Sequence, residues 1–374
     1  MLPFSDIDFF LFAAGYVALI WLLKLFLSDK NYSIITFIVT AFYLIAYYKY
    51  SYEAIGFGIF SFIYIQYLSK FINHKLWNSI ILAIPMILLK VHLNPGFIFF
   101  AGSSFVTFRS IQVFLDKKPE DKISFIDYFN FLFFIPALLI GPLDRFKRFS
   151  DNSAKGFSTI TFDQVLDGWQ EFIKGVLYKF IIAEFVSRYW LNSASLDKHS
   201  ALYYINDIYS YTIFLFFDFA GYSSMAIGMA KMIGINLPFN FNAPFLAVNP
   251  PDFWQRWHAS LTNWLTDYVF KPFYKYLSGK QSLKKYPITK QNLAIFLTLF
   301  IMGCWNGFEP NFIYSGMVYG LFSVVHNIYV IECRKKDKDV IFGNLSPQLV
   351  KYISIFVMFN LACFALWIFS GRYL

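Results

Sequence analysis

The chain has 374 residues, of which 57% are hydrophobic, 22% aromatic and only 15% charged. A soluble globular protein carries about 25% charged residues, so this chain has too few charges to cover a soluble surface. Disorder is excluded because disordered chains are poor in aromatic residues. A disulfide scaffold is excluded as well, since the three cysteines all lie in or beside apolar runs. The composition therefore indicates an integral membrane protein.

The formal net charge of +9 does not indicate a nucleic-acid partner. The positive residues cluster in short segments between apolar stretches, such as Lys275 to Lys290 and Arg334 to Lys338. This pattern is typical of cytoplasmic loops that obey the positive-inside rule. We therefore expect a lipid bilayer, and no nucleic acid, around this chain.

Apolar segments follow one another along the whole chain, and a membrane span needs about 20 mostly apolar residues. Several segments are short or contain Pro85, Pro136, Gly102 or Gly221, which indicates broken or re-entrant helices. We predict about ten or eleven spans in a single membrane domain over residues 1–374. The candidates are Phe9–Ser28, Ser33–Tyr48, Glu53–Phe71, Ser79–Leu93, Gly96–Leu115, Phe125–Leu143, Phe172–Leu191, Tyr203–Met232, Asn292–Trp305, Phe312–Ile331 and Tyr352–Phe369.

The orientation of the chain is partly predictable from its basic segments. The two basic segments named above flank one pair of spans, so they lie on one face, which we take as cytoplasmic. Two other basic clusters, Lys117–Lys122 and Arg145–Arg148, are separated by the single segment Phe125–Leu143. They cannot both be cytoplasmic if that segment crosses the membrane. Either the segment is re-entrant at Pro136, or one cluster contacts something other than a loop boundary.

The most polar part of the apolar chain runs from Phe216 to Phe270. An ionisable residue at membrane depth costs at least about 2.5 kcal/mol, so Asp218, between aromatic residues, is a candidate functional residue. Further on, Asp252 to Phe270 is expected to form one amphipathic helix at the membrane interface. Its tryptophans recur at three- and four-residue spacing, for which we favour the interpretation of an aromatic belt. These are Trp254, Trp257 and Trp264.

His258 lies beside Trp257 in this segment, and a histidine can take or give a proton during acyl transfer. Spacing alone favours the alternative, a buried histidine that is simply hydrogen-bonded. No metal site is expected, because the five histidines show no HxxxH or HxH pairing and the cysteines lie far apart. Nucleophile-elbow and phosphate-loop motifs are absent from the sequence as well.

Four ordered blocks resemble the membrane-bound O-acyltransferase (MBOAT) family. They are GSSFVTFRSIQVFLD (Gly102–Asp116), FIPALLIGPLDRFKRF (Phe134–Phe149), the segment Phe216–Phe270 with its RWH string, and GCWNGFEPNFIYSGMVYG (Gly303–Gly320). The pattern is most similar to the branch that moves D-alanine onto teichoic acids, and next to the alginate O-acetyltransferase branch. The resemblance covers the chain from about Gly102 to His326.

The resemblance implies an all-α multi-span bundle, with re-entrant or interfacial helices, around a central funnel or tunnel in the cell membrane. It implies an acyl group, D-alanyl first and acetyl next, that arrives as a cytoplasmic thioester on the phosphopantetheine arm of an acyl carrier protein. The acceptor would be a hydroxyl of an extracytoplasmic polyol or glycan in the cell envelope. The resemblance implies no permanently bound cofactor. It also implies a small single-span membrane protein as a partner.

The resemblance also implies site residues. The family's RWH histidine corresponds to His258, whereas the near-invariant histidine of its WHG block corresponds to Asn306, 48 residues later (306 − 258). An amide cannot act as a general base, so Asn306 can only orient a substrate by hydrogen bonds. A further family histidine corresponds to Tyr319. Candidates for the substrate tunnel are Asp218, Trp257, Trp305, Tyr319 and His326.

His326 is the remaining nearby imidazole. It shares a helical stripe with Tyr319 and Ser323, which would allow it to face the same cavity as Asn306. The favoured alternative is that His326 caps the cytoplasmic end of a helix near Arg334.

Three explanations of Asn306 stay open at this point. In the first, His258 is the base and Asn306 orients the acceptor hydroxyl. In the second, the chain is a non-catalytic scaffold or conduit, and in the third, Asn306 is an engineered inactive substitution. The rest of the signature is intact, which favours an acyltransferase.

Overall fold

The computed structural model describes residues 7–28, 31–47, 51–91, 102–192, 200–336 and 345–373. Within these ranges the regular structure is helical, apart from an isolated antiparallel bridge between Phe241 and Trp257. The all-α prediction is thereby confirmed. His92, His199 and the predicted span ends at Leu93 and Gly96 lie outside the described residues.

The chain forms two compact units. The first comprises Met1–Phe180 and Phe219–Phe239, and the second comprises Ile181–Asp218 and Asn240–Leu374. Helix α10 (Ala201–Met232) contributes residues to both units. The single membrane domain over residues 1–374 stays a prediction.

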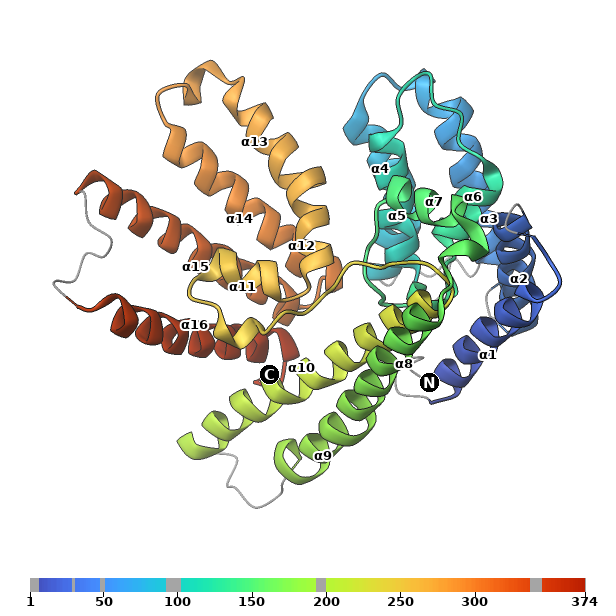
Figure 1. Cartoon of the computed structure of the whole chain (residues 1–374). Helices are drawn as coiled ribbons and strands as arrows, with labels where there is room; N and C mark the ends of the chain where they lie inside the picture. The colour runs from blue at the N-terminus through green and yellow to red at the C-terminus, as the bar shows by residue number, and fades with distance from the viewer. Residues whose placement is uncertain are drawn as a thin grey trace. The chain divides into compact units, whose positions relative to one another are not determined.

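The first unit is built from short helices, several of which are interrupted by π or 3-10 turns (Figure 1). Contacts between aromatic side chains fill its interior, such as the edge-on pair Phe37 and Phe129, whose ring centroids lie 5.0 Å apart. Its helices are α1 (Ile7–Lys24), α2 (Tyr32–Tyr47), α3 (Ser51–Ile63), α4 (Lys75–Lys90), α5 (Ser103–Asp116), α6 (Phe125–Leu132), α7 (Phe146–Ala154) and α8 (Phe162–Val176).

The predicted segment Phe125–Leu143 is interrupted near Pro136, as the proline in its sequence indicated. Helix α6 ends at Leu132, and a 3-10 turn follows at Ile135–Ala137. Arg109 of α5 stabilises this break, because its guanidinium donates to the carbonyls of Leu132 at 2.9 Å and Ala137 at 2.7 Å. Pro136 cannot continue an α-helix, and the buried arginine satisfies carbonyls that the break leaves without helical partners. The break favours the re-entrant alternative over a full crossing.

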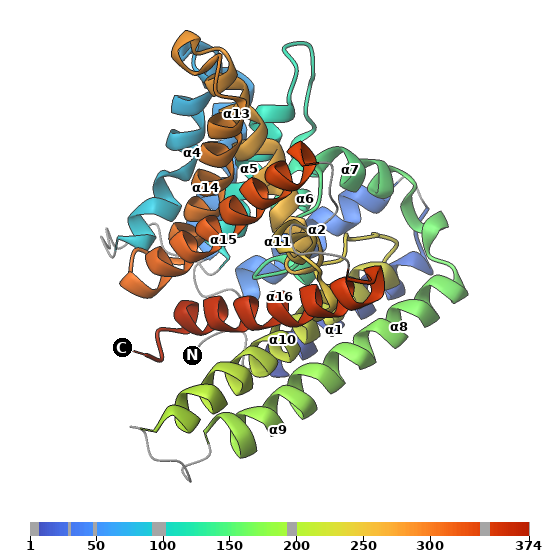
Figure 2. The same cartoon turned by 90° about the vertical axis from the view of Figure 1, so that its left-hand side faces the viewer.

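The second unit holds the longest helices after α10. The hairpin of α14 and α15 is closely packed (Figures 1 and 2). Gly303 of α14 faces Gly316 of α15 so closely that a Cβ on Gly303 would lie 2.7 Å from the Gly316 Cα, which explains why small residues occur there. The elements are α9 (Glu184–Val186), α11 (Pro250–Arg256), α12 (Ala259–Leu265), α13 (Lys271–Ser278), α14 (Pro287–Asn306), α15 (Pro310–Lys335) and α16 (Pro347–Ser370).

Five described helices are long and apolar enough to cross a membrane, judged by length and composition. They are Tyr52–Phe71, Ala201–Met232, Pro287–Asn306, Pro310–Lys335 and Pro347–Ser370. Four shorter apolar helices accompany them: Leu11–Lys24, Tyr32–Ala46, Lys75–Leu88 and Phe125–Ala137. This pattern is that of an integral membrane protein, whereas the count of ten or eleven spans stays a prediction.

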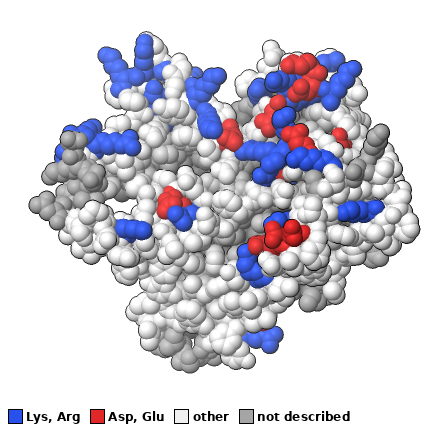
Figure 3. Space-filling view, in the orientation of Figure 1, with Lys and Arg blue, Asp and Glu red and all other residues white. Residues whose placement is uncertain are grey.

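The α14–α15 hairpin places two basic segments at one end of the second unit. Lys290 lies in the first turns of α14, and Arg334 and Lys335 lie in the last turn of α15. Figure 3 shows Lys and Arg gathered over the tip formed by α13 and the start of α14. Asn306 ends α14 and therefore lies at the opposite end of that helix. We call these the basic end and the Asn306 end of the second unit.

Candidate active site

The predicted amphipathic helix Asp252–Phe270 is wrong as a single helix, because the chain breaks at its centre. Helix α11 ends at Arg256, Trp257 is extended, and His258 has left-handed backbone angles (φ 49°, ψ 45°) before α12 begins. A left-handed conformation costs a non-glycine residue of the order of 1 kcal/mol, and such strain is typically found at functional sites. The break turns His258 out of both helices and gives its ring a fixed position.

Asn240 holds the histidine in place. The Oδ1 atom of Asn240 lies 3.3 Å from Nδ1 of His258 and accepts a hydrogen bond from Oγ of Ser260 at 2.5 Å. The Asn240 carbonyl also accepts from the backbone N–H of Ala259 at 2.9 Å. Because an amide oxygen only accepts, this arrangement selects the tautomer with hydrogen on Nδ1 and a lone pair on Nε2. Sequence reasoning missed Asn240, which lies 18 residues from His258.

The His258 ring is neutral at physiological pH. Only 7% of the residue is exposed, and this burial lowers the pKa of His258 to about 3. Burial penalises the charged imidazolium, so Nε2 is suited to accept a hydrogen bond but is a weak base. The structure thus shows the buried, hydrogen-bonded histidine, held in the tautomer that general-base chemistry would require.

Three of the predicted site residues meet at this position. The ring centroids of His258 and Trp305 lie 6.3 Å apart, and Trp305 directly precedes Asn306 at the end of α14. The Asn306 amide donates to the carbonyl of Met302 at 3.0 Å, one helical turn earlier. Asn306 therefore caps its own helix, as an amide can, and brings no proton acceptor of the kind that the family's histidine supplies.

The aromatic-belt interpretation of the tryptophans is wrong. Trp254, Trp257 and Trp264 are each at most 8% exposed, so they face protein rather than lipid. Trp257 stacks on Phe253 with ring centroids 5.7 Å apart, and Trp254 packs edge-on against Tyr319 at 4.7 Å. Trp257 and Tyr319 thus belong to one aromatic cluster, which Phe253 and Trp254 connect.

A cavity of about 390 Å³ lies in the second unit between α11, α12, α14 and α15. His326 and Ser323 line it, whereas Asn306 does not, so the prediction that His326 faces the same cavity as Asn306 is not confirmed. His326 is the one predicted tunnel residue in the described lining, which does not include Asp218, Trp257, Trp305 or Tyr319. The interpretation of His326 as a helix cap is wrong, because α15 continues for nine residues beyond it to Lys335 (335 − 326). The polar lining residues are Gln255, Thr262, Asn263, Thr266, Gln291, Thr298, Ser323, His326 and Asn327.

The walls of this cavity suit a polar, uncharged ligand. Lys, Arg, Asp and Glu are absent from its described lining. Ser323 is 5% exposed, and its Oγ has no hydrogen-bond partner among the described residues, nor has Oγ1 of Thr262. Buried hydroxyls are normally hydrogen-bonded, so these two indicate a site that a ligand or water completes.

Asp218 lies apart from this cavity, on the half-buried face of α10. Tyr211, two helical turns before Asp218, is within electrostatic reach of Asp218 and of Tyr319. A group of three or more His, Cys, Asp or Glu side chains that would hold a metal ion does not occur among the described residues.

The chain belongs to the family of membrane-bound O-acyltransferases (MBOAT), whose pattern it matches over residues 14–368. It is therefore an integral membrane protein and an acyltransferase. It is 32% identical over 286 residues to the "Teichoic acid D-alanyltransferase" of Bacillus subtilis (strain 168), which covers 75% of this chain and 71% of that protein. The protein of the same name from Streptococcus thermophilus is 30% identical over 79% of this chain and 74% of its own length. A "Probable alginate O-acetylase" of Pseudomonas syringae pv. tomato is 31% identical over 67% of this chain and 47% of its own.

Proposed function

We propose that this chain transfers an acyl group, D-alanyl first and acetyl second, from a cytoplasmic thioester to a hydroxyl of a cell-envelope polymer outside the cell membrane. The two relatives named as teichoic acid D-alanyltransferases, each matched over more than 70% of its length, support D-alanyl as the group. The relative named as an alginate O-acetylase supports acetyl as the second choice.

One observation carries the proposal: the cavity runs from the basic end of α14 toward Asn306. Its lining residues on α14 are spaced as one helical face: Gln291, Ile295, Thr298, Leu299 and Met302. From Gln291 to Met302 the helix rises over 11 residues (302 − 291), or about 16 Å. Met302 is also the residue whose carbonyl accepts the Asn306 hydrogen bond. The cavity lining on α14 thus begins one residue after Lys290 and ends at Met302, one helical turn before Asn306, which does not itself line the cavity.

The proposed occupant is the pantetheine part of a carrier protein's arm. This arm is extended, uncharged below its phosphate and carries two amide groups, so it needs neutral donors and acceptors along its path. Gln255, Asn263 and Gln291 supply amide groups on the cavity wall, and the hydroxyl of Ser323 supplies another partner. The thioester would then reach the region of Trp305 and His258.

The transfer itself requires the acceptor hydroxyl to lose a proton as its oxygen attacks the thioester carbonyl, and the carrier thiol then leaves. The Nε2 atom of His258 is the proton acceptor that this site offers, and the low pKa of His258 makes it a weak one. We therefore propose that asparagine in place of histidine at residue 306 limits the rate of acyl transfer by this chain. The second candidate function is a conduit without transfer, and the hydrogen bond from Asn306 to its own helix supports it.

Filling the cavity should block the donor without preventing carrier docking. Thr298 lies on the cavity face of α14 and is 7% exposed. We expect Thr298→Phe to lower transfer from a D-alanyl carrier by at least about tenfold, because a near-attack geometry tolerates little displacement. Leu293→Phe on the same helix, at a position that is 45% exposed, is the matched control. Equal transfer by Thr298→Phe and the parent, in reconstituted vesicles, would reject the cavity as the donor's path.

Carrier docking should depend on the basic end. Carrier proteins of this kind are acidic, and Lys275, Lys284 and Lys285 are exposed there. Reversing these three charges to Glu is expected to weaken carrier binding by about tenfold or more at low salt, and raising the salt concentration should weaken binding of the parent. Binding is measured by surface plasmon resonance, with the exposed Lys155→Glu as control. Binding that responds neither to salt nor to the reversals would place the carrier elsewhere.

A further inference from the structure

An apolar groove of about 240 Å³ lies in the first unit between α1, α8 and the end of α10. Helices α8 and α10 lie side by side (Figures 1 and 2), and glycines let them approach closely, because a Cβ on Gly168 would lie 2.8 Å from the Gly228 carbonyl oxygen. The described lining consists of apolar and aromatic side chains. On α1 it runs from Ala14 to Trp21, seven residues (21 − 14), or about 10 Å. This length is about a third of the hydrocarbon core of a bilayer.

One end of the groove is polar. There Nε1 of Trp21 donates to the carbonyl of Met232 at 2.8 Å, and Nζ of Lys24 donates to the carbonyl of Ile160 at 2.6 Å. The Lys24 ammonium also lies 4.9 Å from the centroid of the Trp21 ring. Tryptophan and lysine at the end of an apolar helix are typical of the level of the lipid headgroups. The apolar part of the groove then extends from this level into the hydrocarbon.

A buried hydrogen-bond donor lies at the same polar end. The Nε2 atom of Gln164 is buried and has no hydrogen-bond partner among the described residues. Gln164 directly precedes Val165, which lines the groove, and it lies one helical turn before Gly168. A Cβ on Gly168 would lie 2.7 Å from Cγ of Met232, another lining residue. The Gln164 side chain is therefore on the side of α8 that faces α10 and the end of the groove.

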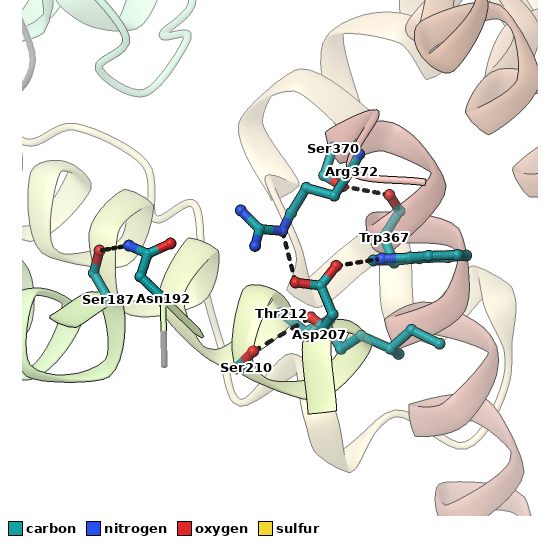
Figure 4. Close-up of polar contacts among 9 residues, drawn as sticks. Ser187, Asn192, Asp207, Ser210, Thr212, Trp367, Ser370 and Arg372 are labelled. Carbon is teal, nitrogen blue, oxygen red and sulfur yellow. Dashed lines mark hydrogen bonds and ion pairs between the residues drawn. The ribbon is translucent and has the colours of Figure 1, made fainter. Parts of the chain in front are cut away.

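Buried polar groups in this chain can be fully paired, as Asp207 of α10 demonstrates. Figure 4 shows its carboxylate between the Trp367 indole and the Arg372 guanidinium, and each donates to a different oxygen at 2.8 Å. Asp207 is 2% exposed, so its oxygens depend on donors from the protein. The Gln164 amide lacks such an arrangement. A buried N–H without an acceptor is destabilising, which indicates that a ligand accepts from it.

We infer that the groove binds one acyl chain of a membrane phospholipid, whose ester carbonyl accepts a hydrogen bond from Nε2 of Gln164. The ester joins the acyl chain to the glycerol, so a chain that lies along the apolar lining brings this carbonyl to the polar end. The adjoining phosphate meets the ammonium groups of Lys24 and Lys231 there, the second of which Asp167 holds at 2.9 Å. The inference does not depend on the proposed function, because the residues that carry it belong to the first unit.

The experiment measures lipid binding by native mass spectrometry of the full chain, purified in dodecyl maltoside and stripped of lipid. The probes are two phosphatidylglycerols of equal chain length, one with ester-linked chains and one with ether-linked chains, which lack the carbonyl. We expect the parent to bind the first diester molecule about 3- to 10-fold more tightly than the diether, the usual effect of one neutral hydrogen bond. Equal binding of the two lipids by the parent would overturn the inference, and this comparison stands even if a variant fails to fold.

Two substitutions test the donor and the groove separately. Gln164→Leu should abolish the preference for the diester, because it removes the donor and keeps a similar volume. Ala18→Phe should weaken binding of both lipids by at least about tenfold, because the added ring fills the groove. The matched controls are Gln170→Leu, at an exposed position of α8, and Ile38→Phe on α2, where the side chain is 58% exposed. If Gln164→Leu and Ala18→Phe bind both lipids as the controls do, the lipid is only part of the general annulus and the inference is rejected.

Discussion

Asn306→His is expected to raise acyl transfer by about 10²- to 10⁴-fold, the range that a positioned general base contributes. The reason is that Asn306 ends α14 beside Trp305, whose ring lies 6.3 Å from that of His258, so an imidazole introduced there enters a formed site. The measurement is transfer of D-alanyl and of acetyl groups from loaded carrier protein in reconstituted membranes.

Asn206→His on α10 provides the control for adding a histidine elsewhere in the chain. His258→Ala, made in the Asn306→His background, should reduce the gained activity, because it removes the neighbouring imidazole. If Asn306→His changes little while His258→Ala abolishes transfer by the parent, His258 is the working base and the proposed limit at residue 306 is wrong. If the parent and both variants are inactive with both acyl groups, the conduit function is favoured.

Acid is expected to destabilise the second unit through His258. The folded-state pKa of about 3 lies below the ordinary value of 6.5, so the unfolded chain binds the proton more readily. The stability from neutral, buried His258 is therefore fully present above pH 6.5 and is lost as the pH falls toward 3. The loss is about 1.4 kcal/mol for each pH unit in that window, and roughly 5 kcal/mol over all of it. Thermal unfolding in detergent between pH 7 and pH 4 measures it.

The control for this slope is His258→Gln, which fills similar space, can donate to Asn240 and does not titrate in this range. The difference in unfolding temperature between parent and variant should shrink as the pH falls, because only the parent must keep an imidazole uncharged. A difference that stays constant from pH 7 to pH 4 would show that His258 titrates normally and is more accessible to water than its 7% exposure indicates.

The sequence by itself determined the class of the protein. Its low charge and its apolar segments of about 20 residues reflect transfer from water to lipid, which depends on composition and needs no knowledge of contacts. The four ordered blocks identified the family, and they also located His258 and the departure at Asn306. Helix α14 was predicted over Asn292–Trp305 and is observed over Pro287–Asn306. The prediction was close because a long apolar run has few stable structures other than a helix.

The tertiary structure decided the features that depend on distant partners. Periodicity extended a helix through His258, whereas Asn240 stabilises a left-handed break there by hydrogen bonds that the local sequence does not show. Arg109 likewise sustains the break after Leu132 from 23 residues away, and Asp207 meets Arg372 across 165 residues. A broken helix at membrane depth is stable only where other side chains satisfy its freed backbone groups. Those side chains come from elsewhere in the fold, so local sequence patterns could not supply them.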